Sequence, residues 1–194
     1  IGNAKAYEMM SCFEGLAALY RQTDDLSQRE AVLALHRQVR DHEIFVTGVG
    51  GLRDEWGEYW HQGRLNQVRC DCGGIGETCV TTTWLKLCAE TLLLTGDPTI
   101  ADDMERALSN GILGAMTPDG TWWMHVNPTP LAGASSRTRA GDQLPGFGED
   151  CCVANGPEGL ALAPWLAVMR GPAGPMITLY EHMTAEVPLN SGET

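Results

Sequence analysis

The sequence predicts an all-α chain that forms part of an α/α toroid with a few short strands. Two observations lead to this prediction. Apolar residues recur at three- and four-residue intervals along two pairs of segments, which is the helical period. Each pair is joined by a short polar turn, at 19–25 and at 92–97, so a helical hairpin repeats without intervening strands. Repeated helical hairpins are typical of a toroid.

The first hairpin is expected between residues 4 and 43. Its first helix carries apolar residues from Ala4 to Tyr20 and ends at 23–25. Ser27 precedes Glu30 by three residues, a spacing typical of a capping box that opens the second helix. This helix is expected to continue towards Glu43.

The second hairpin is expected about seventy residues later. Its first helix runs over 80–92 and stops at Thr95-Gly96-Asp97, and Pro98 opens a helix that continues to Leu113. A last helix is expected over 157–169, with Asn155 as its N-cap. Residues 122–126 and 176–180 have the pattern of short strands.

The charge and hydropathy of the chain restrict its partners. The formal net charge of −12 repels phosphate backbones and anionic lipids, so neither nucleic acid nor a membrane surface is an expected partner. No segment reaches the roughly 20 apolar residues of a membrane span. Neutral, hydroxyl-rich substrates meet no such repulsion, and six Trp offer apolar faces against which a sugar ring can pack.

Seven cysteines are distributed unevenly, at positions 12, 70, 72, 79, 88, 151 and 152. An odd number in a chain of 194 residues is poorly explained by a disulfide framework. Their grouping indicates metal binding or thiol chemistry instead. Cys12 and Cys88 lie in apolar helical patterns and are expected to be inert core residues.

A candidate zinc site combines one carboxylate with three thiolates, a donor set that tetrahedral zinc accepts. It consists of Glu77, Cys79, Cys151 and Cys152, which lie next to the expected starts of two helices, where the helix dipole favours thiolate. Two alternatives remain open at this point. Cys70 and Cys72 could supply thiolates instead, and the cysteines could simply be buried free thiols.

Two carboxylates, Glu55 and Glu58, lie in a loop rich in aromatic residues. An apolar environment raises the pKa of a carboxyl group and makes it a candidate proton donor, whereas a solvated turn would leave it without such a role. Glu105 is by default a residue on a helix surface.

Several segments together resemble the beta-L-arabinofuranosidases of glycoside hydrolase family 127, once catalogued as DUF1680. The segments that carry the resemblance are Lys5-Ala6-Tyr7-Glu8-Met9-Met10, Val46-Thr47-Gly48, Gly57-Glu58, Glu77-Thr78-Cys79, Met104-Glu105-Arg106-Ala107-Leu108 and Cys151-Cys152-Val153-Ala154-Asn155-Gly156-Pro157. The resemblance implies that residues 1–174 form part of an (α/α)6 toroid and that 175–194 begin a linker or a β-sandwich.

The resemblance also implies a reaction and a set of site residues. Zinc would be held by Glu77, Cys79, Cys151 and Cys152, with Cys151 as the nucleophile of a retaining glycosidase. Glu58 would act first as the general acid and then as the general base. The substrate-binding positions would be Glu105, His125, which stands where the family often has tyrosine, and Asn3, which stands where it has a histidine.

Other interpretations of the same residues follow from the sequence. The thiolates could hold a structural zinc, or merely pack, in a noncatalytic helical domain. A thiol redox module would instead join Cys151 to Cys152, or Cys70 to Cys72, by a disulfide. Since part of a toroid exposes an apolar edge, the chain is expected to self-associate or to associate with other parts of the same protein.

Overall fold

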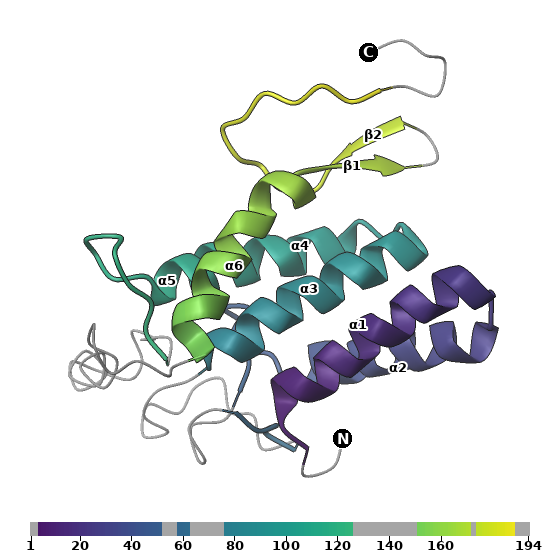
Figure 1. The fold of residues 1–194 in the computed structure, drawn as a ribbon, viewed down its shortest axis with the longest axis horizontal. Coiled ribbons are helices and arrows are strands. Elements are labelled where there is room, and N and C mark those ends of the chain that lie inside the picture. The colour runs from purple at the N-terminus through teal and green to yellow at the C-terminus, as the bar shows by residue number, and fades with distance from the viewer. Residues whose placement is uncertain (1–3, 52–57, 63–75, 126–150, 172–173, 189–194) are drawn as a thin grey trace.

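A computed structural model describes residues 4–51, 58–62, 76–125, 151–171 and 174–188, and the chain in it is mostly helical, as predicted (Figure 1). The helices are α1 (Ala6–Thr23), α2 (Leu26–His42), α3 (Thr78–Thr95), α4 (Thr99–Arg106), the π-helix η2 (Ala107–Ile112), α5 (Leu113–Ala115) and α6 (Cys151–Leu166). Strands β1 (Val168–Gly171) and β2 (Gly174–Ile177) form an antiparallel hairpin. None of the described helices is long and apolar enough to cross a membrane.

Helices α1 and α2 form the first predicted hairpin. Helix α1 ends where expected, because Asp24 adopts the left-handed conformation (φ 55°) and its N–H donates to the carbonyl of Tyr20 at 2.8 Å. The predicted capping box is wrong. Asp25 is the N-cap, and its carboxylate accepts from the backbone N–H of Ser27 at 2.9 Å. An ionised Asp also interacts favourably with the helix dipole, so α2 begins one residue earlier than Ser27.

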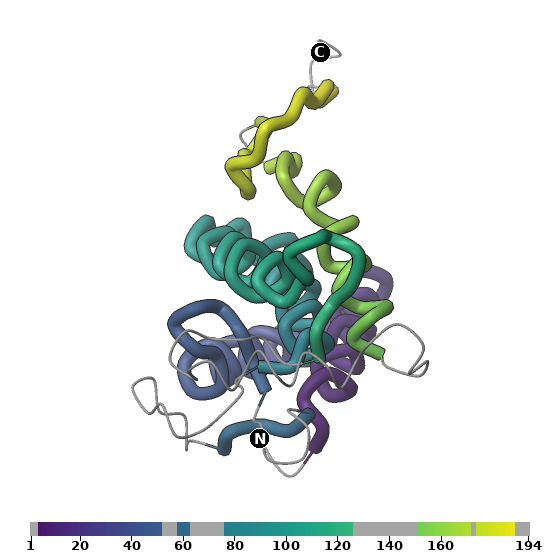
Figure 2. Tube along the Cα trace, turned by 90° about the vertical axis from the view of Figure 1, so that its left-hand side faces the viewer, coloured from purple at the N-terminus to yellow at the C-terminus, as the bar shows by residue number. Residues whose placement is uncertain are grey.

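Helix α3 is the core helix of the described chain. It packs against α1, α2, α4 and α6 (Figures 1 and 2). Of its 18 residues, 13 are buried. Some of its buried threonine hydroxyls donate to carbonyls four residues earlier, as in the bonds from Thr81 to Glu77 and from Thr83 to Cys79. The helix ends at Gly96, which takes the left-handed conformation at φ 68°. The second predicted hairpin, α3 followed by α4, is therefore confirmed.

The helix predicted to continue to Leu113 is interrupted by the π-helix η2. Gly111 lies in η2 directly against α3, where an added Cβ would be 2.4 Å from Cγ2 of Thr81. This close approach of the two helices requires glycine. The periodicity of the apolar residues does not reveal the wider turn of a π-helix. Such turns frequently occur at functional sites.

Helix α6 corrects the prediction that a helix begins at 157 after Asn155 as N-cap. It begins at Cys151 and runs through Pro157. The residue before a proline normally avoids the α conformation because of its Cβ, and Gly156 has none. Gly156 also lies against Trp123, where a Cβ would be 2.2 Å from the ring. Packing therefore extends the helix back to the two cysteines.

The strands also differ from the prediction. Only one isolated bridge, between Met116 and Trp123, forms in the described part of the predicted strand 122–126. The neighbouring backbone groups bond to helix ends instead, as when Met124 N–H donates to the carbonyl of Ala115 at 2.8 Å. Strand β2 covers only the start of the predicted strand 176–180, and β1 was not predicted. The proposed boundary at residue 174 stays a prediction.

Cys88 is buried as predicted, but Cys12 is exposed. The buried residues of α1 are Ala6, Met10 and Ala17, and Cys12 follows Met10 by two positions, about 200° around the helix. Cys12 therefore lies on the solvent face.

Buried His36 makes the stability of the core depend on pH. Its ring stacks on Trp84 with centroids 4.9 Å apart, and burial lowers its pKa from 6.5 to about 4. The folded state therefore disfavours protonation. The contribution of neutral His36 to the free energy of unfolding is complete above pH 6.5. It decreases as the pH falls towards about 4, by roughly 3 kcal/mol in total. Urea unfolding across this range should show a steeper acid loss for the wild type than for His36→Phe, and equal slopes would contradict the prediction.

Candidate functional site

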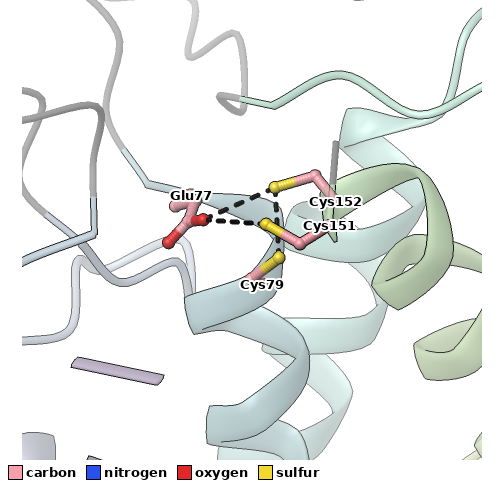
Figure 3. Close-up of side chains that lie close together, drawn as sticks. All are labelled: Glu77, Cys79, Cys151 and Cys152. Atoms are coloured by element: carbon pink, nitrogen blue, oxygen red, sulfur yellow. Dashed lines mark hydrogen bonds between the residues drawn. The ribbon is translucent and has the colours of Figure 1, made fainter. Parts of the chain in front are cut away.

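The candidate site lies where the N-terminal ends of α3 and α6 meet. Glu77 is the N-cap residue of α3, Cys79 is the second residue of that helix, and Cys151 and Cys152 begin α6. Both helix ends present partial positive charge, which favours carboxylate and thiolate. Figure 3 shows the carboxylate of Glu77 and the three sulfurs turned towards one another.

The four donor atoms are spaced closely enough to share one metal ion. All lie within 4.8 Å of one another. The sulfur of Cys79 is 3.2 Å from that of Cys152, and Oε1 of Glu77 is 3.6 Å from the sulfur of Cys152 and 3.9 Å from that of Cys151. Ligands at zinc–oxygen and zinc–sulfur distances in a tetrahedron are separated by roughly 3.3–3.8 Å, and the three distances above lie within or close to this range, so the cluster is near the size that one ion requires.

Burial of the carboxylate supports the same conclusion. Glu77 is fully buried, and its Oε2 has no hydrogen-bond partner among the described residues. Desolvation raises the pKa of Glu77 to about 8, and the charges of Cys151 and Glu58 act in the same direction, while His125 opposes them. A buried carboxylate in this position is stabilised by a cation, because a metal ion supplies the charge that solvent cannot.

Cys151 differs from the other two cysteines of the cluster. Hydrogen bonds from Cys152 and Cys79 lower the pKa of Cys151, whereas donating these bonds raises the pKa of each partner. Cys151 is also half-buried, while Cys79 and Cys152 are fully buried. Cys151 therefore combines a lowered pKa with partial access to solvent, two properties that favour a reactive cysteine.

Asn155 connects the two helices at the site. Its Nδ2 donates to the sulfur of Cys79 at 3.3 Å and to the carbonyl of Cys151 at 3.0 Å. Its own carbonyl accepts from the hydroxyl of Thr82 on α3 at 3.0 Å. The sequence predicted Asn155 as a helix cap and placed it in the cysteine-pair motif but did not predict these contacts, although its spacing of four residues from Cys151 places both on one helical face.

Glu58 lies near this cluster and is held by the start of α1. Its carboxylate pairs with Nζ of Lys5 at 2.7 Å, and its backbone carbonyl accepts from the N–H of Ala6 at 2.7 Å. The charge of Glu58 contributes to the raised pKa of Glu77, so the two carboxylates are within electrostatic reach. Nothing in the sequence pattern indicated that Lys5 would be the partner of Glu58.

The structure describes only some of the other predicted site residues. His125 lies beside the cluster, with Nδ1 3.7 Å from the sulfur of Cys152. Glu105 is half-buried on α4, and its contact with a sugar stays a prediction. Asn3, Glu55, Cys70 and Cys72 lie outside the described residues. None of the described cysteines, including the three of the cluster, is joined in a disulfide.

Comparisons with known proteins identify the family of the chain. The family described as beta-L-arabinofuranosidase, GH127 catalytic domain, matches residues 3–164. Among solved structures, the crystal structure of Ara127N-Se, a GH127 beta-L-arabinofuranosidase from Geobacillus stearothermophilus T6, is similar, with a TM-score of 0.71 and 25% identity. The match covers 91% of this chain and 28% of that chain, so the described helices correspond to part of a GH127 domain. The comparison with curated proteins gives no match. Since the family match spans most of the sequence, the chain belongs to the GH127 beta-L-arabinofuranosidase catalytic-domain family.

Proposed function

We propose that this chain carries the reacting groups of a retaining glycoside hydrolase with a zinc-bound cysteine nucleophile, acting on beta-L-arabinofuranosides or related sugars. The observation that carries the proposal is the convergence of Glu77, Cys79, Cys151 and Cys152 within 4.8 Å, in a chain of the GH127 family. The match covers 28% of the similar glycosidase, so the activity of such a whole glycosidase is here a proposal.

The four clustered residues would hold the metal ion. Three sulfurs and one carboxylate form a donor set that suits zinc, and the buried, unpartnered Oε2 of Glu77 is consistent with a cation at this position. When bound, zinc stabilises cysteine sulfur as thiolate near neutral pH.

The proposed reaction uses Cys151 and Glu58. The sulfur of Cys151 attacks the anomeric carbon while the bond to the leaving oxygen breaks, and Glu58 donates a proton to that oxygen. Glu58 then takes a proton from water, whose oxygen attacks the same carbon and releases Cys151 as thiolate. Two displacements at one carbon retain its configuration. The ion pair with Lys5 suits the second step, in which Glu58 must be a carboxylate.

Sugar recognition is proposed for Glu105, His125 and Asn3. Glu105 and His125 are both half-buried, so each has side-chain surface that a ligand can contact. The net charge of −12 is compatible with a neutral carbohydrate and opposes anionic ligands.

A second candidate is a noncatalytic helical domain with a structural zinc. The observation that favours it is the complete burial of Glu77, Cys79 and Cys152, since structural zinc sites are closed to solvent. The partial exposure of Cys151 favours the catalytic proposal, because a nucleophile must be accessible to its substrate.

The two candidates are separated by metal analysis and covalent trapping. The purified chain is loaded with zinc, freed of excess metal and incubated with an aryl beta-L-arabinofuranoside. Intact-protein and peptide mass spectrometry then locate any bound sugar. One equivalent of zinc and a pentosyl adduct on Cys151 would support the glycosidase. One equivalent of zinc without an adduct or turnover would favour the structural site, and absence of zinc would refute the metal centre.

A further inference from the structure

His125 is attached to both helices that carry the cluster. Its carbonyl accepts from the backbone N–H of Thr78 at 2.9 Å, in the first turn of α3. The hydroxyl of Thr78 donates to the carbonyl of Met124 at 2.5 Å, so two successive residues are fixed to this turn. From this anchored backbone the ring reaches α6, where Nδ1 lies 3.7 Å from the sulfur of Cys152.

We propose that His125 is a positioning residue of the metal centre, whose Nδ1–H donates a hydrogen bond to the sulfur of Cys152 and thereby strengthens the hold of the cluster on zinc. The inference rests on the proposed function. A metal-bound cysteine is a thiolate without a proton, so a hydrogen bond between ring nitrogen and sulfur can then run only from N–H to sulfur.

The net charge of the proposed zinc site explains what this hydrogen bond would contribute. Three thiolates and one carboxylate carry four negative charges, against two positive charges on a zinc ion. N–H donors to sulfur offset part of the excess. Within the described chain, the side-chain N–H groups that reach the cluster are those of Asn155, at the sulfur of Cys79, and His125, at the sulfur of Cys152.

The positions of these two donors distinguish the two cysteines that would only bind zinc from the cysteine that would also react. Asn155 donates to the sulfur of Cys79, and His125 lies beside the sulfur of Cys152; both of these cysteines are fully buried, whereas Cys151 is half-buried. A hydrogen bond withdraws electron density from a thiolate and makes it a weaker nucleophile. The arrangement therefore favours Cys152 as a ligand and leaves its neighbour Cys151 as the reactive sulfur.

The test measures zinc affinity by competition with a chelator, together with the sulfur-to-metal charge-transfer band of the cobalt-substituted chain. His125→Phe removes the donor and is expected to lower zinc affinity by about 10–100-fold. Its charge-transfer band should move to lower energy, because the sulfur electrons are less stabilised. His125→Asn retains an amide N–H near the position of Nδ1 and should recover most of both properties. His182→Phe, at an exposed position, is the matched control.

Each outcome decides the inference. Weaker binding and a shifted band in His125→Phe, with recovery in His125→Asn, would support it. Unchanged affinity and band in a variant with wild-type circular dichroism would overturn it and leave the proposed glycosidase intact. Should His125→Phe fail to fold, a cobalt band in His125→Asn close to the wild type would support the inference, and a shifted one would oppose it. A wild-type chain that binds no zinc would overturn both proposals.

Discussion

Serine in place of Cys151 is expected to lower glycoside hydrolysis by at least about 10³-fold, because it removes the group that would attack the anomeric carbon. Hydrogen bonds from Cys152 and Cys79 lower the pKa of Cys151, which favours the thiolate form of the wild-type side chain. A serine hydroxyl in the same place ionises far less readily and remains a poor nucleophile. Initial rates on an aryl beta-L-arabinofuranoside measure the loss, at substrate concentrations above and below KM.

Cys12→Ser provides the matched control for this substitution. It makes the same exchange of sulfur for oxygen at an exposed position on α1, outside the cluster, and should leave the rate unchanged. A Cys151→Ser variant that retains the wild-type rate would contradict the proposed mechanism and assign the nucleophile elsewhere. Circular dichroism of both variants separates a loss of chemistry from a loss of structure.

The helical hairpins could be predicted because their signals are local. The ends of α1 and α3 follow from polar turns, and the buried face of each helix follows from the apolar period. The start of α6 could not be predicted in this way. Pro157 and Asn155 together are typical of a helix start, and the outcome depends on contacts of Gly156 with Trp123, thirty-three residues earlier in the chain.

The candidate site illustrates the same distinction. Each half of it has a local signal, a Glu-Thr-Cys element at one helix start and a cysteine pair at another. The count and grouping of cysteines left Cys70 and Cys72 as a weaker alternative, and the family resemblance strengthened the link between Cys79 and Cys152, which are 73 positions apart. The Lys5–Glu58 pair and the contact of His125 with Cys152 have no sequence signal, because side-chain direction decides both.

Replacing a buried ligand should have a second large effect, on metal binding. Cys79→Ser removes one of the four donors, and one ligand contributes roughly a quarter of an apparent zinc-binding free energy of about 10–16 kcal/mol. Zinc affinity is therefore expected to fall by about 10²–10³-fold. The free energy of unfolding measured in zinc should fall with it, because metal binding to the folded state stabilises that state.

Cys88→Ser is the matched control, since Cys88 is also fully buried and lies on the same helix α3. Its sulfur is 3.6 Å from Nε2 of His36, and it belongs to the hydrophobic core rather than to the cluster. This variant should lose stability equally with and without zinc and keep the wild-type affinity, whereas Cys79→Ser should lose more stability in zinc than in chelator. Chelator competition and urea unfolding, each with and without zinc, measure the difference. Equal zinc affinities in the two variants would show that Cys79 is not a ligand, and the cluster would then be a set of packed thiols around a buried, protonated Glu77.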